Sequence, residues 1–318
     1  MKIFQGIRNP DEIEPLVKAG ASEFYTGFTG REFSLTNHYE PCYGIESGQQ
    51  LKSALERAHA LDAKLFVAVN NTFYGDSEIQ QCRDSFSRLM DMGVDGFILA
   101  SLPLLLEARN LKLNCEICLS TLQPVFNTEA YEFFLDLGIQ RIVFPEHVSA
   151  GEVERILRDP RIKTEAFFHL SHDCTNIEAF CLFHHQDYKY LTLKPSNRFD
   201  HCRTKPHMEA APGDDVAQSI VDGYEYKDRF KINHFGNLYD FHRLGLDYLK
   251  MGNRPLHLEH KLLMLDVASK ALAILERETL SRVEFLAQAE ALMREVLAQQ
   301  GYGELDTMYE EMYKWYYK

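Results

Sequence analysis

Short apolar segments rich in β-forming residues alternate with helix-like segments along most of this 318-residue chain. The β-like segments span residues 2–7, 23–28, 64–70, 96–100, 116–121, 141–145, 164–169, 231–235 and 248–252, and the helix-like segments include 48–61, 77–92, 128–137 and 150–157. Nearly continuous apolar strands separated by helices are typical of parallel strands that are covered on both faces. About eight such repeats favour an α/β fold of the (β/α)8 TIM-like barrel type over an open sheet.

Two regions depart from this alternation. The stretch 188–226 is polar and rich in Pro, His and Asp, and we expect a long functional loop or insert there. From residue 257 the chain is largely helical, and it ends in an aromatic segment, 308–317. We therefore predict a barrel-like domain over residues 1–255 and a C-terminal helical extension over 256–318 that packs on the barrel or on a partner.

Three of the seven cysteines, Cys174, Cys181 and Cys202, follow the β-like segment 164–169. Cys174 and Cys181 would lie on the loop that leaves the carboxyl end of a strand, where barrel enzymes carry out their chemistry. Nothing at the start of the chain reads as an export signal, so we expect a reducing cytoplasm, where metal ligation or packing is commoner than disulfide formation. The three thiols therefore predict a zinc or iron–sulfur site, with buried apolar packing as the alternative.

A fourth thiolate would have to come from elsewhere, because no cysteine follows Cys202. Cys42 is one candidate for the fourth ligand, and His234 is its main rival. Cys115 and Cys118 straddle a β-like segment, so their side chains would point to opposite faces and we predict that both are structural. Cys82 lies in a helical stretch and is expected to pack in the core.

Several polar residues are candidates for substrate contacts. His169 and His172 belong to a histidine-rich region, and either can exchange a proton near neutral pH, although solvated loop histidines would read the same way. Residues at or beyond strand ends could hold a polar substrate, or could simply cap helices; these are Arg31, Asn70, Gln123 and Asn127. Lys250 and Arg254, at the last strand, could neutralise an acidic substrate or pair with surface carboxylates.

The charge balance limits the classes of partner. A net charge of −13 argues against broad, phosphate-driven nucleic-acid binding, although it leaves room for one local basic groove. No apolar run reaches the roughly 18 residues of a membrane span. A small-molecule or nucleotide substrate fits these limits best.

Five segments in order carry a family resemblance: 19–27 (AGASEFYTG), 67–70 (VAVN), 119–123 (LSTLQ) with Asn127, 137–145 (LGIQRIVFP) and 248–254 (YLKMGNR). They resemble the collagenase-like "U-thirty-two" peptidase family over about the first 275 residues. The resemblance implies a [4Fe–4S] cluster held by four cysteines. For several members it also implies oxygen-independent hydroxylation of the ubiquinone ring or of RNA bases.

The resemblance assigns the ligands only in part. Cys174 and Cys181 look like the first two cluster cysteines of the family, and Cys202 looks like the third. The family's usual fourth cysteine, further downstream, is missing here. Some members instead use a cysteine on the loop after the second strand, and Cys42 lies on that loop, further along it.

Departures from the family pattern indicate a substrate different from those of the better-known members. Members often carry Pro-Arg-Glu where this chain has Pro145-Glu146-His147, and a His-Gly pair where it has His169-Leu170. We expect an iron–sulfur enzyme or enzyme subunit, working with a second subunit of the same family. The alternatives are a peptidase, for which no Gly-x-Ser-x-Gly or His-Glu-x-x-His pattern is present, and a non-catalytic scaffold that contains a structural zinc.

Overall fold

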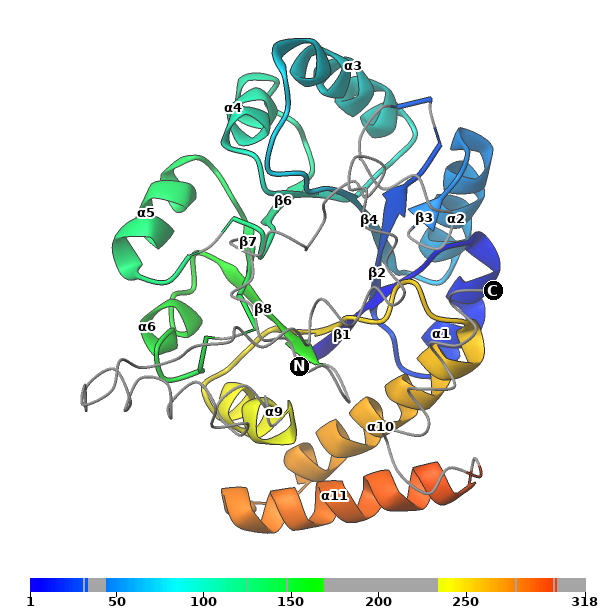
Figure 1. Cartoon of the computed structure of the whole chain (residues 1–318), viewed down its shortest axis with the longest axis vertical. Helices are drawn as coiled ribbons and strands as arrows, with labels where there is room; N and C mark the ends of the chain where they lie inside the picture. The colour runs from blue at the N-terminus through cyan, green and yellow to red at the C-terminus, as the bar shows by residue number, and fades with distance from the viewer. Residues whose placement is uncertain are drawn as a thin grey trace, which may run out of the picture.

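The described part of the computed structural model comprises residues 1–30, 32–33, 44–123, 125–146, 148–168, 234–277, 279–299 and 301. Eight parallel strands form a closed ring (Figure 1). They are β1 (Lys2–Gly6), β2 (Glu23–Phe28), β4 (Lys64–Val69), β5 (Gly96–Leu99), β6 (Glu116–Leu119), β7 (Arg141–Val143), β8 (Lys163–Phe168) and β9 (Tyr248–Met251). Strand β1 closes the ring because it pairs with β2 on one side and with β9 on the other. The predicted (β/α)8 barrel is confirmed.

A helix follows each strand of the ring and covers its outer face (Figure 1). These helices are α1 (Ile13–Lys18), α2 (Gly48–Ala60), α3 (Asp76–Asp91), α4 (Leu102–Asn110), α5 (Thr128–Asp136), α6 (Glu154–Leu157), α9 (His234–Arg243) and α10 (Leu258–Arg277). A short 3-10 turn, η1 (Pro10–Glu12), precedes α1, and the two-residue strand β3 (Gly44–Ile45) pairs with the end of β2. Neither short element was predicted from the sequence.

One predicted strand is wrong. The segment 231–235 was expected to be β-like, but His234 and Phe235 begin helix α9, and residues 231–233 lie outside the described part. Phe235, Leu238 and Phe241 repeat every three residues, so they lie on one face of a helix and pack into the core. Strand β8 pairs directly with β9, which leaves no place in the ring for another strand.

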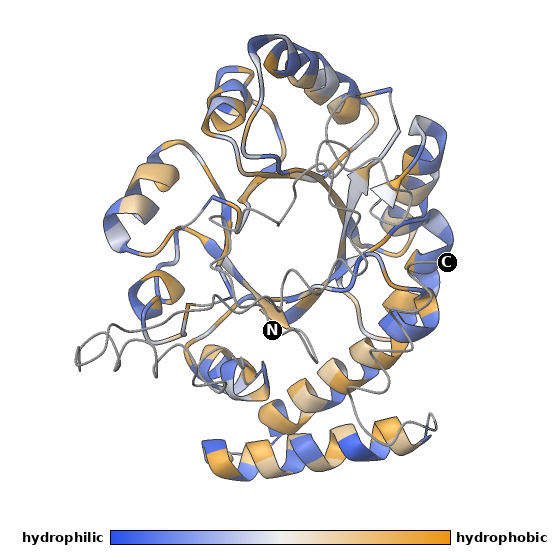
Figure 2. Ribbon diagram, in the orientation of Figure 1, coloured by the Kyte–Doolittle hydropathy of each residue, from blue (hydrophilic) through white to orange (hydrophobic). Residues whose placement is uncertain are grey.

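Two layers of apolar side chains stabilise the barrel. The larger layer lies between the ring and its helices, and alternate strand residues such as Ile3, Leu65 and Phe97 point into it. The smaller layer fills the inside of the ring and comprises Phe4, Tyr25, Phe66, Ala68, Ile98, Cys118, Val143 and Tyr248. In Figure 2 the strands are mostly orange, whereas the helices mix orange and blue residues. The strands are therefore mostly apolar, as is typical of parallel barrel strands, and a few charged residues are buried among them.

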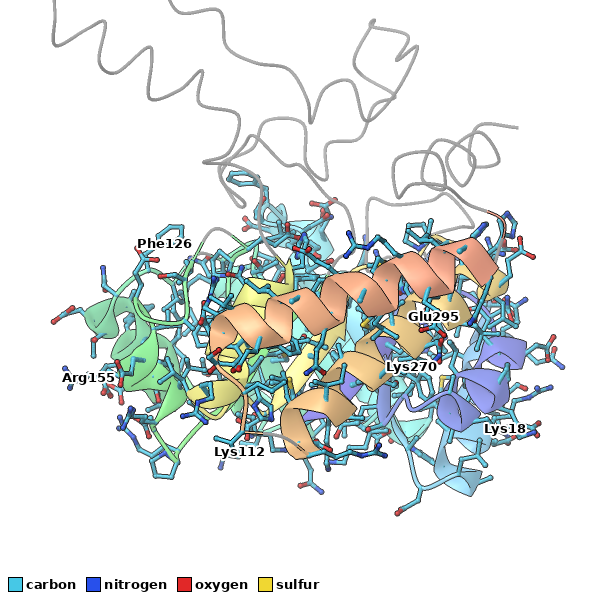
Figure 3. All side chains as sticks on the ribbon, turned by 90° about the horizontal axis from the view of Figure 1, so that it is seen from below. Lys18, Lys112, Phe126, Arg155, Lys270 and Glu295 are labelled. Carbon is cyan, nitrogen blue, oxygen red and sulfur yellow. The ribbon has the colours of Figure 1, made fainter. Side chains whose placement is uncertain are left out.

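The C-terminal helices share the outer layer. Helix α10 packs against α1, and its residues Met264, Leu265 and Ala268 are buried in the same core as the ring. Helix α11 (Arg282–Gln299) contacts α9 and α10, on which it lies in Figures 1 and 3. The proposed division at residue 255 stays a prediction. Among the helices that the structure describes, none is long and apolar enough to cross a membrane.

Candidate functional site

The predicted metal ligands and proton-transfer groups fall mainly outside the described residues. They are Arg31, Cys42, His169, His172, Cys174, Cys181 and Cys202. What the structure does define is where their segments leave the barrel: 34–43 follows β2, which ends at Phe28, and 169–233 follows β8, which ends at Phe168. All ring strands are parallel, so both segments leave from the carboxyl-terminal face.

His234, the rival fourth ligand, is described and lies at the same face. It is the first residue of α9, and the centre of its ring is 6.3 Å from that of Phe168 at the end of β8. Within the described ranges there is no group of three or more His, Cys, Asp or Glu side chains that could hold a metal ion. The role of His234 as a ligand remains a prediction.

The three described cysteines are structural, as predicted. Cys118 lies inside the ring, whereas Cys115 packs against the outer layer, so the two thiols point to opposite sides of β6. Cys82 is fully buried on α3. Burial raises the pKa of Cys82 and of Cys115 to about 12. Since a metal binds the thiolate form, these side chains are poor ligands.

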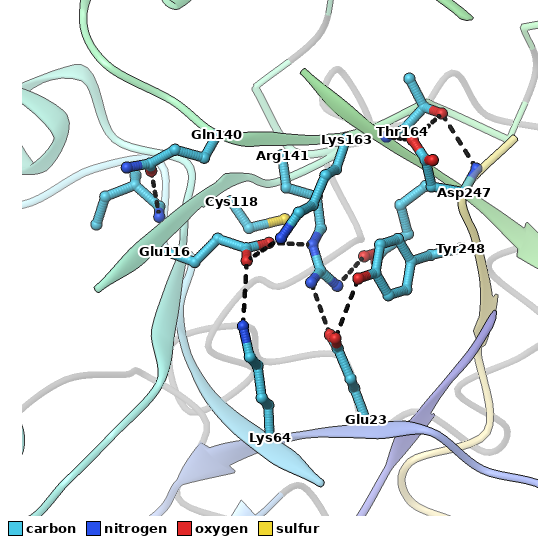
Figure 4. Close-up of polar contacts among 12 residues, drawn as sticks. Glu23, Lys64, Glu116, Cys118, Gln140, Arg141, Lys163, Thr164, Asp247 and Tyr248 are labelled. Carbon is cyan, nitrogen blue, oxygen red and sulfur yellow. Dashed lines mark hydrogen bonds and ion pairs between the residues drawn. The ribbon is translucent and has the colours of Figure 1, made fainter. Parts of the chain in front are cut away.

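A fully buried arginine lies inside the amino-terminal half of the ring (Figure 4). Arg141 of β7 donates from Nη2 to Glu23 at 2.6 Å and from Nε to Glu116 at 2.6 Å, and its Nη1 lies 3.3 Å from Glu165. Its guanidinium also stacks over the ring of Tyr248 at 3.8 Å. Three strands other than β7 therefore supply a carboxylate to one cation, which ties the strands together across the interior.

The charges of this network stabilise one another. Burial alone would raise the pKa of Glu116, but Arg141 and the 2.6 Å hydrogen bond from Lys163 outweigh it and lower that pKa. Burial alone would lower the pKa of Arg141. The carboxylates of Glu165 and Glu23 outweigh burial and raise that pKa, so the guanidinium stays charged. We name this set the barrel network: Glu23, Glu116, Arg141, Lys163, Glu165, Tyr248 and Lys250.

Lys250 extends the barrel network toward the carboxyl-terminal half. Its Nζ lies 2.8 Å from Oε1 of Glu165 and 4.7 Å from the centre of the Tyr25 ring. Burial would lower the pKa of Lys250, but Glu165 and Tyr25 raise it above its ordinary value, so the ammonium stays charged. Lys250 therefore pairs with a carboxylate, but the prediction of a surface carboxylate is wrong, because Glu165 is fully buried.

The carboxyl-terminal end of the interior carries small residues. Gly6 ends β1, and a Cβ there would lie 2.6 Å from the Cβ of Arg254, so only glycine lets this arginine cross the strand so closely. The Arg254 guanidinium then lies 5.8 Å from the centre of the Tyr25 ring. Gly27 of β2 and Ala68 of β4 are register partners at the same end of the ring.

A second charged group surrounds the ends of β1 and β9. We name it the β1–β9 cluster: Arg8, Glu12, Arg254, His257 and Lys261. Glu12 Oε2 accepts from the buried Lys261 Nζ at 2.6 Å, and Glu12 Oε1 accepts from Arg8 Nε at 3.2 Å. Arg8 Nη2 lies 2.8 Å from Nδ1 of His257. Arg8 and Glu12 come from the start of the chain and the other three residues from about 250 positions later, and they meet because β1 and β9 are neighbours in the ring.

Of the polar residues after strand ends, one has a structural role. Asn127 is the N-cap of α5, and its Oδ1 accepts a hydrogen bond from the Ala130 amide at 2.8 Å. Capping therefore accounts for its presence. Asn70 and Gln123 are half-buried beyond β4 and β6, respectively.

A cavity of about 750 Å³ opens at the opposite, amino-terminal end of the ring. Its wall includes both acidic and basic side chains, among them Lys64, Glu116 and Lys163. Lys163 and Lys64 both lie close to Glu116, at 2.6 and 3.9 Å. In barrels this end contributes to stability, and catalytic groups gather at the other end.

Comparison with known proteins identifies the family. The profile described as Peptidase family U32 matches residues 8–304, which is nearly the whole chain. The chain belongs to peptidase family U32. The resemblance drawn from the five sequence segments is confirmed, and the functional residues of this U32 member can be sought among those that gather at the carboxyl-terminal face.

Relatives of this U32 chain are named for a reaction on RNA. Over 197 residues it is 27% identical to the tRNA hydroxylation protein P1 of Bacillus subtilis (strain 168), which covers 62% of this chain and 44% of the relative. Over 175 residues it is 27% identical to the tRNA hydroxylation protein P of Helicobacter pylori (strain J99), covering 55% and 40%. The chain thus spans less than half the length of these relatives.

A solved structure titled as the U32 peptidase Mk0906 shares 13% identity with the chain. The match covers 53% of this chain and 69% of that one, with a TM-score of 0.43.

Sequence reasoning missed two groups in this U32 chain. Arg141 was quoted only as part of a strand motif, although a charged residue inside an apolar run is a sign of a buried ion pair. Arg8, Glu12 and Lys261 were not singled out at all. Glu12 and Lys261 are separated by 249 positions, and no local spacing connects them.

Proposed function

We propose that this chain takes part in an oxygen-independent hydroxylation and that it holds an iron–sulfur cluster for this purpose. One observation carries the proposal: the relatives it matches over more than half of its length are named tRNA hydroxylation proteins. The closed barrel supports it, because both cysteine-bearing segments leave the face where barrel enzymes place their chemistry.

The proposed ligands are Cys174, Cys181 and Cys202, with Cys42 as the fourth and His234 as the alternative. The donor chemistry fits, since four thiolates suit a [4Fe–4S] centre and also suit zinc. The described part of the barrel offers no competing metal site, and its three cysteines are structural. A bound cluster would supply transfer of single electrons beside the substrate.

The proposed substrate is a small organic or nucleotide ring, such as a base of an RNA. Recognition of one base requires only local contacts, so it is compatible with a net charge of −13 and with the expected lack of broad nucleic-acid binding. His169, His172 and Arg31 are proposed to move protons or bind the substrate. The aromatic segment 308–317 and the net charge of −13 lead us to propose that a second protein of the same family takes part in the activity.

Anaerobic purification tests the cofactor. We expect a brown protein with broad visible absorbance and iron and sulfide in equal amounts. Loss of iron in Cys174→Ser, Cys181→Ser and Cys202→Ser is expected, and Cys42→Ser tests the fourth position. If iron is kept only in Cys42→Ser, the fourth ligand is another group, such as His234. Matched controls are Cys82→Ala and Cys115→Ala, which should keep the metal because these thiols pack in the core.

The reaction is tested by mass spectrometry of nucleosides from the tRNA of cells with and without the gene. Loss of a nucleoside heavier by one oxygen atom, restored by the wild-type gene but not by Cys174→Ser, is the expected result. A colourless protein with one zinc per chain would favour the scaffold alternative. Cleavage of a protein substrate that persists in every cysteine variant would favour the peptidase alternative.

A further inference from the structure

Lys250 lies inside the barrel, toward its carboxyl-terminal half. On β9 it is the register partner of Phe4 on β1 and of Phe167 on β8, and both phenylalanines pack in the smaller apolar layer. Its Nζ lies 5.3 Å from the centres of these two aromatic rings and 4.7 Å from that of Tyr25. Only 6% of the lysine side chain is exposed, so a cation is buried among aromatic faces.

The ammonium of Lys250 has donors left over. A lysine ammonium carries three N–H donors and no acceptor. Within the described part of the chain its carboxylate partner is Glu165, whose Oε1 lies 2.8 Å away but accepts no hydrogen bond, so the contact is an ion pair without an aligned donor. By contrast, each guanidinium nitrogen of Arg141 lies beside a carboxylate. Because a buried charge is costly unless its donors find acceptors, Lys250 has the capacity to bind a further acceptor.

Small residues occupy the inward positions nearest the carboxyl-terminal face. Side chains of a strand alternate between its two faces, so the inward position that follows Tyr25 on β2 is Gly27, and the one that follows Cys118 on β6 is Ser120. On β4 the last member of the smaller apolar layer is Ala68. These three strands therefore place no large side chain at this end of the interior.

Ser120 is a second buried donor at this end. Its side chain is 2% exposed, and its Oγ accepts a hydrogen bond from the Leu122 amide at 3.3 Å. Among the residues that the structure describes, no acceptor takes the hydroxyl proton. A buried hydroxyl that accepts but does not donate leaves part of its hydrogen-bonding capacity unused. Lys250 and Ser120 thus offer donors from two sides of the same interior.

The two donors select the chemistry of a ligand. Hydrogen bonds from an ammonium are strongest to an oxygen that carries negative charge. Inside a barrel of low dielectric constant, a nearby cation also favours the ionised form of an acidic group. The aromatic faces of Phe4, Tyr25 and Phe167 favour contact with a flat apolar body. Together these features suit a planar ring that carries a carbonyl or an ionised hydroxyl oxygen.

We infer that Lys250 binds the substrate by donating to an oxygen on its ring, with Ser120 as a second donor. This inference rests on the proposed function and narrows its substrate to a ring that carries such an oxygen. Of the four RNA bases, guanine, cytosine and uracil carry a ring carbonyl, whereas adenine has none. Hydroxylation of an adenine is therefore not expected.

The probe 4-nitrophenol tests this binding without turnover, because its ionised form alone is yellow. Added to the full chain, it should bind and ionise at a lower pH than in water, since the ammonium stabilises the phenolate. Difference absorbance against the protein alone measures the shift. Lys250→Met should remove the shift and weaken phenolate binding by about tenfold or more, the effect of losing one charge-assisted hydrogen bond. Lys250→Arg, which keeps the charge, should retain part of the shift.

Lys163→Met is the matched control. It is the same substitution at a lysine of the same network, but Lys163 pairs with Glu116 at the amino-terminal end, so binding of the probe should not change. Lys250→Met leaves Glu165 with Arg141 as its cation and should lower stability. Lys250→Met combined with Glu165→Gln removes both charges and should restore stability in urea, while the shift stays absent. A shift that returned in the double variant would mean that Lys250 only supports the fold.

The nucleosides of tRNA give a second readout. The heavier nucleoside is expected to derive from a base with a ring carbonyl and to be lost in the double variant, although its iron content equals that of the wild type. Three results would overturn the inference: a heavier adenosine, undiminished product in the folded double variant, or no ionisation shift of the probe with the wild type. A chain that shifts the ionisation of the probe but modifies no tRNA would keep Lys250 as a binding residue and remove the proposed function.

Discussion

The two ends of the barrel interior use charge in opposite ways. At the amino-terminal end, Arg141 is fully buried and its guanidinium is matched by Glu23, Glu116 and Glu165. At the carboxyl-terminal end, Arg8 and the buried Lys261 of the β1–β9 cluster both pair with the carboxylate of Glu12. In the first arrangement one cation is surrounded by carboxylates, and in the second two of the described cations meet at one carboxylate.

This difference shows that buried charge alone does not mark a functional site. A buried ion network whose partners are all supplied by the fold fixes the packing of the ring and has nothing left to bind. The β1–β9 cluster is only partly buried, because Arg8 is half-buried and His257 is exposed. Four predictions, from the largest expected effect to the smallest, test whether the two ends differ in this way.

Removing the central cation should have the largest effect. Arg141→Met leaves three carboxylates inside the ring without their shared partner, and we expect a loss of about 3–5 kcal/mol in the free energy of unfolding. Urea denaturation at pH 7 measures it. Arg155→Met, at an exposed position, should change stability by less than about 0.5 kcal/mol. If the two variants were equally stable, the barrel network would not be structural.

The burial of Lys261 at the carboxyl-terminal end should appear as a pH effect, because burial lowers the pKa of its ammonium. The pKa of Lys261 is about 8 in the folded chain against 10.5 ordinarily, so between these values the unfolded chain holds a proton that the folded chain has released. Stability should therefore rise with pH in this window, by at most about 1.4 kcal/mol per pH unit.

Lys261→Met should remove this contribution, while Arg8 still neutralises Glu12. Unfolding by urea at several pH values from 7 to 10.5 gives the difference in slope between wild type and variant. Parallel profiles for the two proteins would contradict a lowered pKa for the buried Lys261.

A polar residue beyond a strand end should prove structural. Asn127→Ala removes the hydrogen bond that caps α5 and should cost about 1 kcal/mol of stability. Asn127→Asp or Asn127→Ser, which can also cap a helix, should restore most of the stability. Urea denaturation measures both effects, and an unchanged stability of Asn127→Ala would contradict the capping role.

The smallest effect is expected at the edge of the barrel network. Lys163 donates to Glu116 at 2.6 Å, but its side chain is 43% exposed. Lys163→Met should cost less than about 1 kcal/mol, because Arg141 still neutralises Glu116 and water screens the lost pair. Comparison with Arg141→Met by the same urea measurement separates the centre of the network from its rim. Equal losses would mean that Lys163 is as important as the buried arginine.

Prediction from the sequence succeeded where structure is local. The period and composition of the apolar runs identified all eight ring strands to within one or two residues, for example Glu23–Phe28, because strands buried on both faces leave a continuous apolar signal. The segment 231–235 was misassigned because a short apolar run fits a helix as well as a strand. The opposite placement of Cys115 and Cys118 followed from the two-residue period of a strand.

What the sequence determined by itself is the barrel, the family and the face on which the cysteine-bearing segments leave it, because these depend on local periodicity and on motifs in order. Only the tertiary structure decided which charges meet. Arg141 finds Glu23, and Lys261 finds Glu12, across more than a hundred intervening residues in each case. Ring closure brings β1 beside both β2 and β9, so partners distant in the chain become neighbours. Which partner a charge meets depends on that closure, which no local pattern encodes.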